Sequence, residues 1–171
     1  QEGGGVRVYI GQTHGKKMNA ILDAEGFGEM TVREEFPPRR RPWAFDNGAF
    51  KDHTAAIPFK AAAFEKSLSM MLEQQLRPDF LVVPDIVAGG LESLRFSERW
   101  APKLWGMAPL YLAVQDGMEE PDINAGPYAG IFVGGSVPWK LKTGASGGRF
   151  AHALGLGCHI GRVGTPQRVR W

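Results

Sequence analysis

The chain has 171 residues, the size of one domain, and its 43% hydrophobic and 22% charged residues are ordinary for a globular protein with a core. The formal net charge of +2 excludes a polycation that binds nucleic acid through charge alone. The single cysteine, Cys158, excludes an internal disulfide and a four-cysteine zinc site, and it fits a reducing cytosol. No apolar run approaches the ~20 residues that span a bilayer. We therefore expect one cytoplasmic domain over residues 6–171, with residues 1–5 as a tag or linker and Cys158 as a small buried hydrophobe.

Six short apolar runs predict strands, and each ends in small or polar residues. They are VRVYIG (6–11), WAFDNG (43–48), FLVVPD (80–85), LYLAVQDG (110–117), GIFVGGS (130–136) and CHIGRVG (158–164). Runs that are almost continuously apolar suit strands covered on both faces, as in a parallel sheet.

Helical patterns lie between several of these runs. Residues 58–76 carry apolar side chains at helical spacing, with prolines suited to the first turn and to the stop. Residues 90–105 predict a second helix, which Pro102 breaks or kinks. Residues 149–155 predict a third, and the Gly147–Gly148 pair interrupts its entry.

The alternation of strands and helices predicts a parallel α/β sheet. Fingerprints of dinucleotide-binding and P-loop folds are missing, which leaves a (β/α)8 barrel or an open flavodoxin-like sheet. Polar residues at the carboxyl ends of four strands favour the barrel, because barrel enzymes keep their chemistry there. These residues are Asp46 with Asn47, Asp85, Gln115 with Asp116, and Gly134 with Gly135. A closed barrel needs eight strands, so we expect a TIM-barrel type of fold that is incomplete or rearranged.

The same residue types suit recognition of a guanine-like base. The carboxylates of Asp46 and Asp85 accept from ring N–H and exocyclic amino groups, whereas the Gln115 amide and the N–H groups of Gly134–Gly135 donate to a carbonyl oxygen. Glycine lets the backbone approach a flat ligand closely. Two side chains are candidates for sandwiching the ring: Phe50 and Met107.

Five motifs, in order along the chain, resemble those of the tRNA-guanine transglycosylase family. FDNGAF is similar to that family's DSGGFQ, VVPDIV to a strand closed by an aspartate, LAVQDG to VQGG, GIFVGGS to a GGL turn, and CHIGRVGTPQ to MGVGTP. Together they cover roughly residues 43–167. In its small size the chain resembles members of the family from phages and DNA-modification clusters, which insert 7-deazaguanine bases into DNA. The resemblance therefore implies base exchange in DNA rather than in tRNA.

The resemblance also implies roles for individual residues. Asp46 is implied as the acid/base or positioning carboxylate beside the sugar, and the implied base-binding set is Asn47, Asp85, Gln115, Gly134 and Gly135. This chain departs from the family at Asn47 (Ser), Ala49 (Gly) and Asp116 (Gly). The nucleophilic aspartate and zinc ligands of the family lie past the position of Trp171. We therefore expect a base-binding surface without complete turnover, and no metal or cofactor.

A basic loop, PPRRRPW, carries Arg39, Arg40 and Arg41. Such a run is either a solvated loop or a set of contacts to nucleic-acid phosphates. The expected partners are DNA or tRNA, a guanine or 7-deazaguanine base, and a second copy of the chain, with no membrane.

Each motif also has a plainer interpretation. Asp46 to Gly48 suits a tight turn, and Asp85 suits a cap for the helix starting near Gly90. Gln115 and Asp116 suit a polar loop. Gly134 to Ser136 suits a phosphate cradle at a helix start. The four histidines are scattered and predict surface or core residues.

Three other functions therefore remain open at this point. One is a glycosylase that removes a modified base on the same scaffold. The second is a non-catalytic subunit that binds a base or nucleic acid. The third is a phosphate-binding barrel enzyme, which rests on FVGGS alone.

Overall fold

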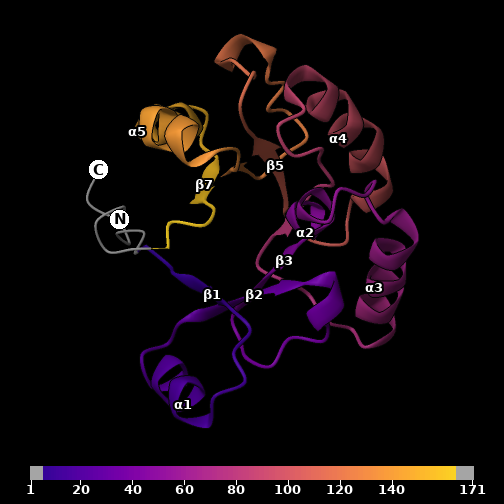
Figure 1. Cartoon of the computed structure of the whole chain (residues 1–171), viewed down its shortest axis with the longest axis vertical. Helices are drawn as coiled ribbons and strands as arrows, with labels where there is room; N and C mark the ends of the chain where they lie inside the picture. The colour runs from indigo at the N-terminus through magenta and orange to yellow at the C-terminus, as the bar shows by residue number, and fades with distance from the viewer. Residues whose placement is uncertain (1–5, 165–171) are drawn as a thin grey trace.

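The computed structural model describes residues 6–164, which form a seven-stranded parallel sheet with helices between its strands (Figure 1). The spatial order of the strands follows the chain from β1 to β7. The strands are β1 (Tyr9–Gly11), β2 (Gly28–Val32), β3 (Trp43–Asp46), β4 (Leu81–Val82), β5 (Leu110–Val114), β6 (Gly130–Val133) and β7 (Gly157–Ile160). The helices are α1 (Lys16–Ala24), α2 (Ala49–Thr54), α3 (Ala61–Glu73), α4 (Gly90–Leu104) and α5 (Val137–Ala153). The expected tag or linker at residues 1–5 lies outside the described residues.

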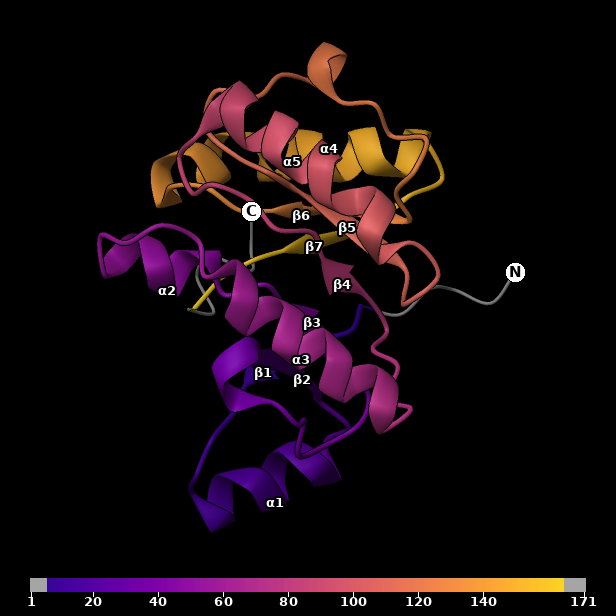
Figure 2. The ribbon, with the colours of Figure 1, turned by 90° about the vertical axis from the view of Figure 1, so that its right-hand side faces the viewer.

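The sheet curls into a half-barrel. The rings of Tyr9 in β1 and His159 in β7 lie 5.7 Å apart between centroids, although these strands are the two ends of the hydrogen-bonded order. Figure 1 shows α1, α3, α4 and α5 spread around the outside of the curl, and Figure 2 shows α3 and α4 side by side against it. The α/β class and the parallel sheet predicted from the sequence are therefore confirmed.

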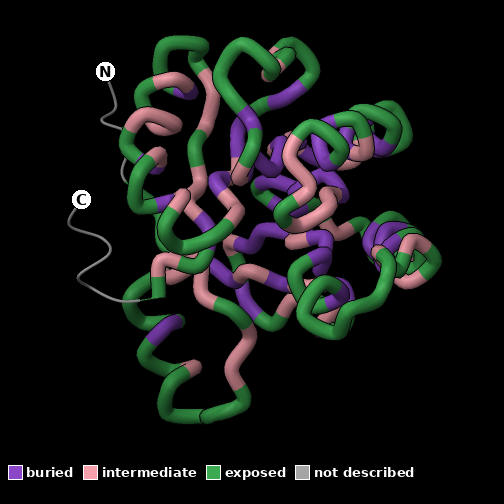
Figure 3. Tube along the Cα trace, turned by 45° about the horizontal axis from the view of Figure 1, so that its top comes forward, coloured by how far each residue is buried: buried purple, intermediate pink, exposed green. Residues whose placement is uncertain are grey.

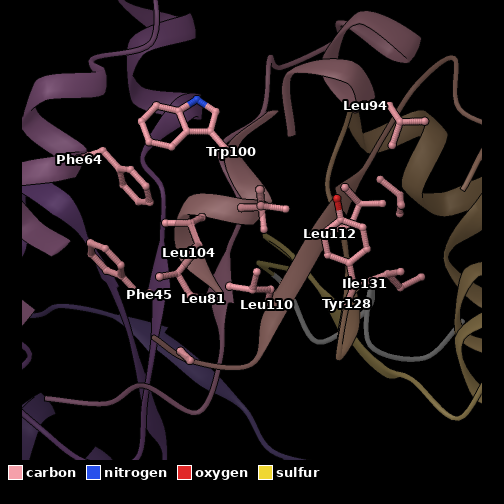
Figure 4. Close-up of a cluster of buried hydrophobic side chains, with 14 of the residues drawn as sticks. Phe45, Phe64, Leu81, Leu94, Trp100, Leu104, Leu110, Leu112, Tyr128 and Ile131 are labelled. Carbon is pink, nitrogen blue, oxygen red and sulfur yellow. The ribbon is translucent and has the colours of Figure 1, made fainter. Parts of the chain in front are cut away.

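Alternate residues of each strand point to opposite faces, which divides the core into two parts. Trp43 and Phe45 of β3 point outward, and Phe45 stacks on Phe64 of α3 at 5.8 Å between centroids. Trp100 of α4 meets Phe64 edge-on. Figure 4 shows the rings of Phe45, Phe64 and Trp100 gathered between the sheet and its helices. Each such fully buried side chain contributes about 1.5–3 kcal/mol to folding.

Side chains of the opposite parity fill the inside of the curl. Ala44, Phe80, Val82 and Ala113 form a small buried cluster there. The buried strands run through the middle of the molecule in Figure 3, with exposed helix surfaces around them. Asp46 shares the parity of Ala44, so its side chain is directed toward the carboxyl end of this inner face.

One strand, β2, was not predicted. Its sequence GEMTV contains Glu29 and Thr31, which are fully buried although polar. The Glu29 carboxylate accepts hydrogen bonds from the Thr31 hydroxyl (2.8 Å), the Gln12 amide (3.0 Å) and the Arg39 backbone N–H (3.0 Å). Because Gln12 and Arg39 come from other segments, the burial of Glu29 cannot be recognised in the run itself.

Helix lengths also differ from the prediction. The expected helix at 149–155 is the end of α5, which runs through Gly147 and Gly148 without interruption. A Cβ at Gly147 would make an ordinary van der Waals contact with the Val133 side chain, at 3.5 Å, so this part of α5 lies against β6. Of the break or kink predicted at Pro102, the break was wrong, since α4 continues through Pro102 to Leu104. None of the helices described here is long and apolar enough to cross a membrane.

Candidate functional site

The carboxyl ends of β3 to β7 surround one pocket at the mouth of the half-barrel. Its floor is formed by inward-facing side chains of β4, β5 and β6: Val82, Ala113 and Phe132. The space in the pocket is narrow, about 50 Å³. Six residues expected from the sequence line it: Asp46, Asn47, Asp85, Gln115, Gly134 and Gly135. The sheet thus brings together residues that are up to 89 positions apart in the chain.

Asp46 closes a tight turn and also lines the pocket. Its Oδ1 accepts a hydrogen bond from the Gly48 N–H at 2.8 Å, and Gly48 adopts the left-handed φ of 78° that favours glycine. Among the described residues, Oδ2 has no hydrogen-bond partner. Burial raises the pKa of Asp46, although the Gly48 N–H and the charges of Arg33 and Arg162 act in the opposite direction. The same residues, Asp46 to Gly48, therefore form a tight turn and place Asp46 in the pocket lining.

Asp85 is held between two amides. Asn47 Nδ2 donates to Oδ1 of Asp85 at 2.8 Å, and Gln115 Nε2 lies 3.2 Å from Oδ2. Burial raises the pKa of Asp85 to about 6, and the nearby Asp46 charge adds to the rise, while the two amides oppose it. A carboxyl group with this pKa is mostly ionised at neutral pH, so Asp85 can accept hydrogen bonds there, and it gains a proton as the pH falls through about 6.

The two amides are themselves fully engaged. Asn47 Nδ2 also donates to the Val83 carbonyl at 2.9 Å, and its Oδ1 accepts from the Ala49 N–H at 2.7 Å. Gln115 Nε2 lies within hydrogen-bonding distance of the Ile86 carbonyl and the Ser93 hydroxyl. Both side chains are buried and orient Asp85, so a direct contact from either to a ligand stays a prediction.

The capping role considered for Asp85 is not adopted. Helix α4 has Gly89 at its N-cap and no side-chain cap. The Ser93 hydroxyl of α4 accepts from the Ile86 N–H at 2.9 Å instead. Gln115 Oε1 accepts from the Ala88 N–H at 2.6 Å, which ties the loop between β4 and α4 to β5.

The loop after β6 is fixed by Asp116. Its carboxylate accepts from the Ser136 N–H at 2.7 Å and the Ser136 hydroxyl at 2.6 Å. Burial acts to raise the pKa of Asp116, but these hydrogen bonds outweigh it and the pKa is lowered. The start of α5 therefore already holds an anion, which weakens the phosphate-cradle interpretation of GGS. Of the two glycines, Gly134 donates its N–H to Val114 O (2.8 Å), whereas the Gly135 N–H has no partner among the described residues.

Arg33, directly after β2, holds the turn that lines the pocket, and it was not among the residues expected from the sequence. Its buried guanidinium donates to the Asn47 carbonyl at 3.1 Å and forms an ion pair with Asp52 of α2. Burial acts to raise the pKa of Asp52, but Arg33 and the Lys60 N–H outweigh it and lower that pKa. This pair joins the turn after β3 to the helix that follows it.

The pocket is also lined by Phe50, Lys140 and Arg162, of which Lys140 is buried and the other two are exposed and form its rim. The Arg162 guanidinium carbon lies 3.4 Å from the centre of the Phe50 ring. Phe50 was one of two expected ring neighbours; the other, Met107, precedes β5 and so lies at the opposite end of the sheet. Arg162 falls within the motif CHIGRVGTPQ, but only its place after β7 identifies it as a rim residue.

The arginine loop lies away from the pocket. Arg41 precedes β3, whereas Asp46 ends it, a separation of roughly 16 Å along the strand at about 3.3 Å per residue. Arg40 is buried, forms an ion pair with Asp23 at 2.9 Å, and donates to Asn19. Arg40 is thus engaged within the fold, and only Arg39 and Arg41 present exposed side chains.

A second, more apolar pocket of about 370 Å³ adjoins the first. It lies among α2, α3 and α4 and shares Asp85 and Val87 with the first pocket. Its aromatic walls are Phe59, Phe96 and Trp100.

The remaining candidate groups are scattered. Cys158, expected to be buried, is exposed. His159 faces the interior, where burial lowers its pKa to about 4, and the other histidines are on the surface, as predicted. Within residues 6–164 no group of three His, Cys, Asp or Glu side chains could hold a metal ion.

The half-barrel and its mouth define an α/β protein with two carboxylates in one pocket at the carboxyl ends of parallel strands. No protein-family model, curated protein or solved structure matches the chain.

Proposed function

We propose that this pocket binds the pairing edge of a guanine-type base, and that the chain is a base-exchange transglycosylase on a (β/α)8 type of scaffold. The exchange replaces guanine in DNA by a 7-deazaguanine base. The observation that supports it best is the convergence of Asp46, Asp85 and Gly135 on one narrow pocket. The resemblance of five motifs to the transglycosylase family supports it independently.

Recognition follows from the hydrogen-bonding capacity of these groups. A carboxylate offers about four acceptor positions, and the two amides on Asp85 occupy only two of them. The others suit the ring N–H and exocyclic amino group of guanine, while the Gly135 N–H suits its carbonyl oxygen. A pocket of this size suits the edge of a flat ring rather than a whole nucleotide, so the base enters edge-first from an extruded position.

The two carboxylates take different roles because their surroundings differ. Asp85 is oriented by two amides and reads the base, whereas Asp46 has one unpaired oxygen at the pocket and transfers the proton. In the first half of the exchange a carboxylate attacks the sugar C1′, the glycosidic bond breaks, and guanine leaves with the bonding electrons and gains a proton. In the second half the incoming base loses a proton, attacks C1′ and releases the carboxylate. No described residue is assigned as this nucleophile, which the resembled family carries on a later strand.

The test is the incorporation of labelled guanine or 7-deazaguanine into DNA and, separately, into tRNA. Where exchange is measured, Asp46→Asn should abolish it while base binding persists, whereas Asp85→Asn should weaken base binding. The control Glu73→Gln changes an exposed carboxylate at the end of α3 and should alter neither. Absence of both exchange and guanine binding would refute the proposal.

A base-removing glycosylase is the second candidate, because one acid/base carboxylate beside a recognition carboxylate is enough to activate water. Release of free base without incorporation would favour it. Binding without any reaction would favour a non-catalytic subunit.

A further inference from the structure

The pocket rim carries a stacked cation that the proposed base chemistry does not use. At 3.4 Å from the Phe50 ring centre, the Arg162 guanidinium lies directly against the ring face. Both side chains are exposed and both line the pocket.

The backbone fixes this side chain at the mouth. Gly161 donates its N–H to the Val133 carbonyl at 3.0 Å and accepts from the buried Lys140 Nζ at 2.9 Å. Arg162 itself has a φ of 56°, a conformation that residues other than glycine seldom adopt. Such outliers gather at functional sites, where the surrounding structure holds them.

The Arg162 charge acts to lower the pKa of the nearby Asp46 carboxylate, but the two groups do not form an ion pair. None of the ion pairs formed by the described residues includes Arg162. Its face rests on Phe50, but the N–H donors of a guanidinium lie in its plane and stay available to the oxygens of a phosphate. A polynucleotide approaching the pocket meets the carboxylates of Asp46 and Asp85, and a cation at the rim offsets that repulsion.

We propose that Arg162, stacked on Phe50, binds the backbone phosphate next to the extruded nucleotide. This contact makes the pocket prefer a base within a polynucleotide over the free base. The inference rests on the proposed base-binding function, and it moves the phosphate contact from the arginine loop to the end of β7.

The test compares two probes: a single-stranded oligodeoxynucleotide with one guanine, and free 7-deazaguanine. Affinities are measured at several salt concentrations for the wild type, Arg162→Ala, Arg162→Lys and Arg77→Ala. Arg77 is an exposed arginine before β4, at the far end of the sheet, and serves as the matched control.

For Arg162→Ala we expect the loss of oligonucleotide affinity to exceed the loss of free-base affinity about tenfold, the size of one charge-assisted hydrogen bond. The slope of log affinity against log salt should fall by about 0.7, the value for one phosphate contact on a single strand. Arg162→Lys should restore the slope, and Arg77→Ala should leave both quantities unchanged. An oligoribonucleotide of the same sequence shows whether binding depends on the sugar.

Equal losses for both probes, or an unchanged salt slope, would overturn the phosphate contact while leaving base binding intact. If the oligonucleotide binds through Arg162 but no guanine-type base binds, the proposed function fails instead. If the wild type binds neither probe, both fail.

Discussion

Replacing Asp85 by Asn should change how the stability of the protein depends on pH. The Asp85 carboxyl ionises near 3.8 in an ordinary setting and near 6 in the folded protein, chiefly because it is buried. At about 1.4 kcal/mol for each tenfold change in proton affinity, this difference corresponds to about 3 kcal/mol. The folded protein holds the proton more tightly than the unfolded chain. The resulting stabilisation is complete below pH 3.8 and is lost as the pH rises through about 6.

Between about pH 4 and about pH 7.5 the free energy of unfolding of the wild type should therefore fall by about 2 kcal/mol relative to Asp85→Asn. Urea unfolding at a series of pH values measures this difference. The variant also loses the acceptor for two amides, so only the trend with pH is diagnostic. Glu73→Gln, on the surface, should follow the wild-type curve. A wild-type-to-Asp85→Asn difference that stays constant within about 0.5 kcal/mol would refute the reasoning.

Three further substitutions test the support of the pocket, each by urea unfolding. Asn47→Ala removes two buried hydrogen-bond donations and should cost about 2–3 kcal/mol; a loss below about 0.5 kcal/mol would contradict the buried network. Arg33→Met leaves the Asp52 carboxylate buried without its cation and should cost about 3–5 kcal/mol, most of it recovered by adding Asp52→Leu. Gly135→Ala places a Cβ against the Asp116 carboxylate at a φ of 74° and should cost at least about 1–2 kcal/mol. Adding Asp116→Ala should recover only the part due to the clash, and full recovery would show that the backbone conformation is not strained.

Much of the fold could be predicted because apolar runs and helical spacing are local signals. Six of the seven strands follow such runs, and α3 and α4 lie within the expected ranges. Strand β2 could not be found this way, because Glu29 is buried by hydrogen bonds from other segments. The continuity of α5 through Gly147 and Gly148 could not be predicted either, because a pair of glycines is a local signal that usually interrupts a helix.

The site could be predicted in place but not in detail. Polar residues at the ends of parallel strands must meet at one edge of the sheet, so the convergence of Asp46 and Asp85 followed from their positions. The roles of their neighbours did not follow. The side-chain amides of Asn47 and Gln115 donate their hydrogen bonds to groups within the protein. Arg40 is buried against α1.

The sequence by itself determined the α/β class, most strand ends and the gathering of acidic and amide groups at one end of the sheet, because these depend on neighbours in the chain. Only the tertiary structure decided which oxygen of Asp46 lacks a partner among residues 6–164, why Asp85 holds its proton up to about pH 6, and that Arg162 stacks on Phe50. Burial, hydrogen bonding and stacking depend on neighbours in space, and the curling of the sheet brings these together from segments far apart in the chain.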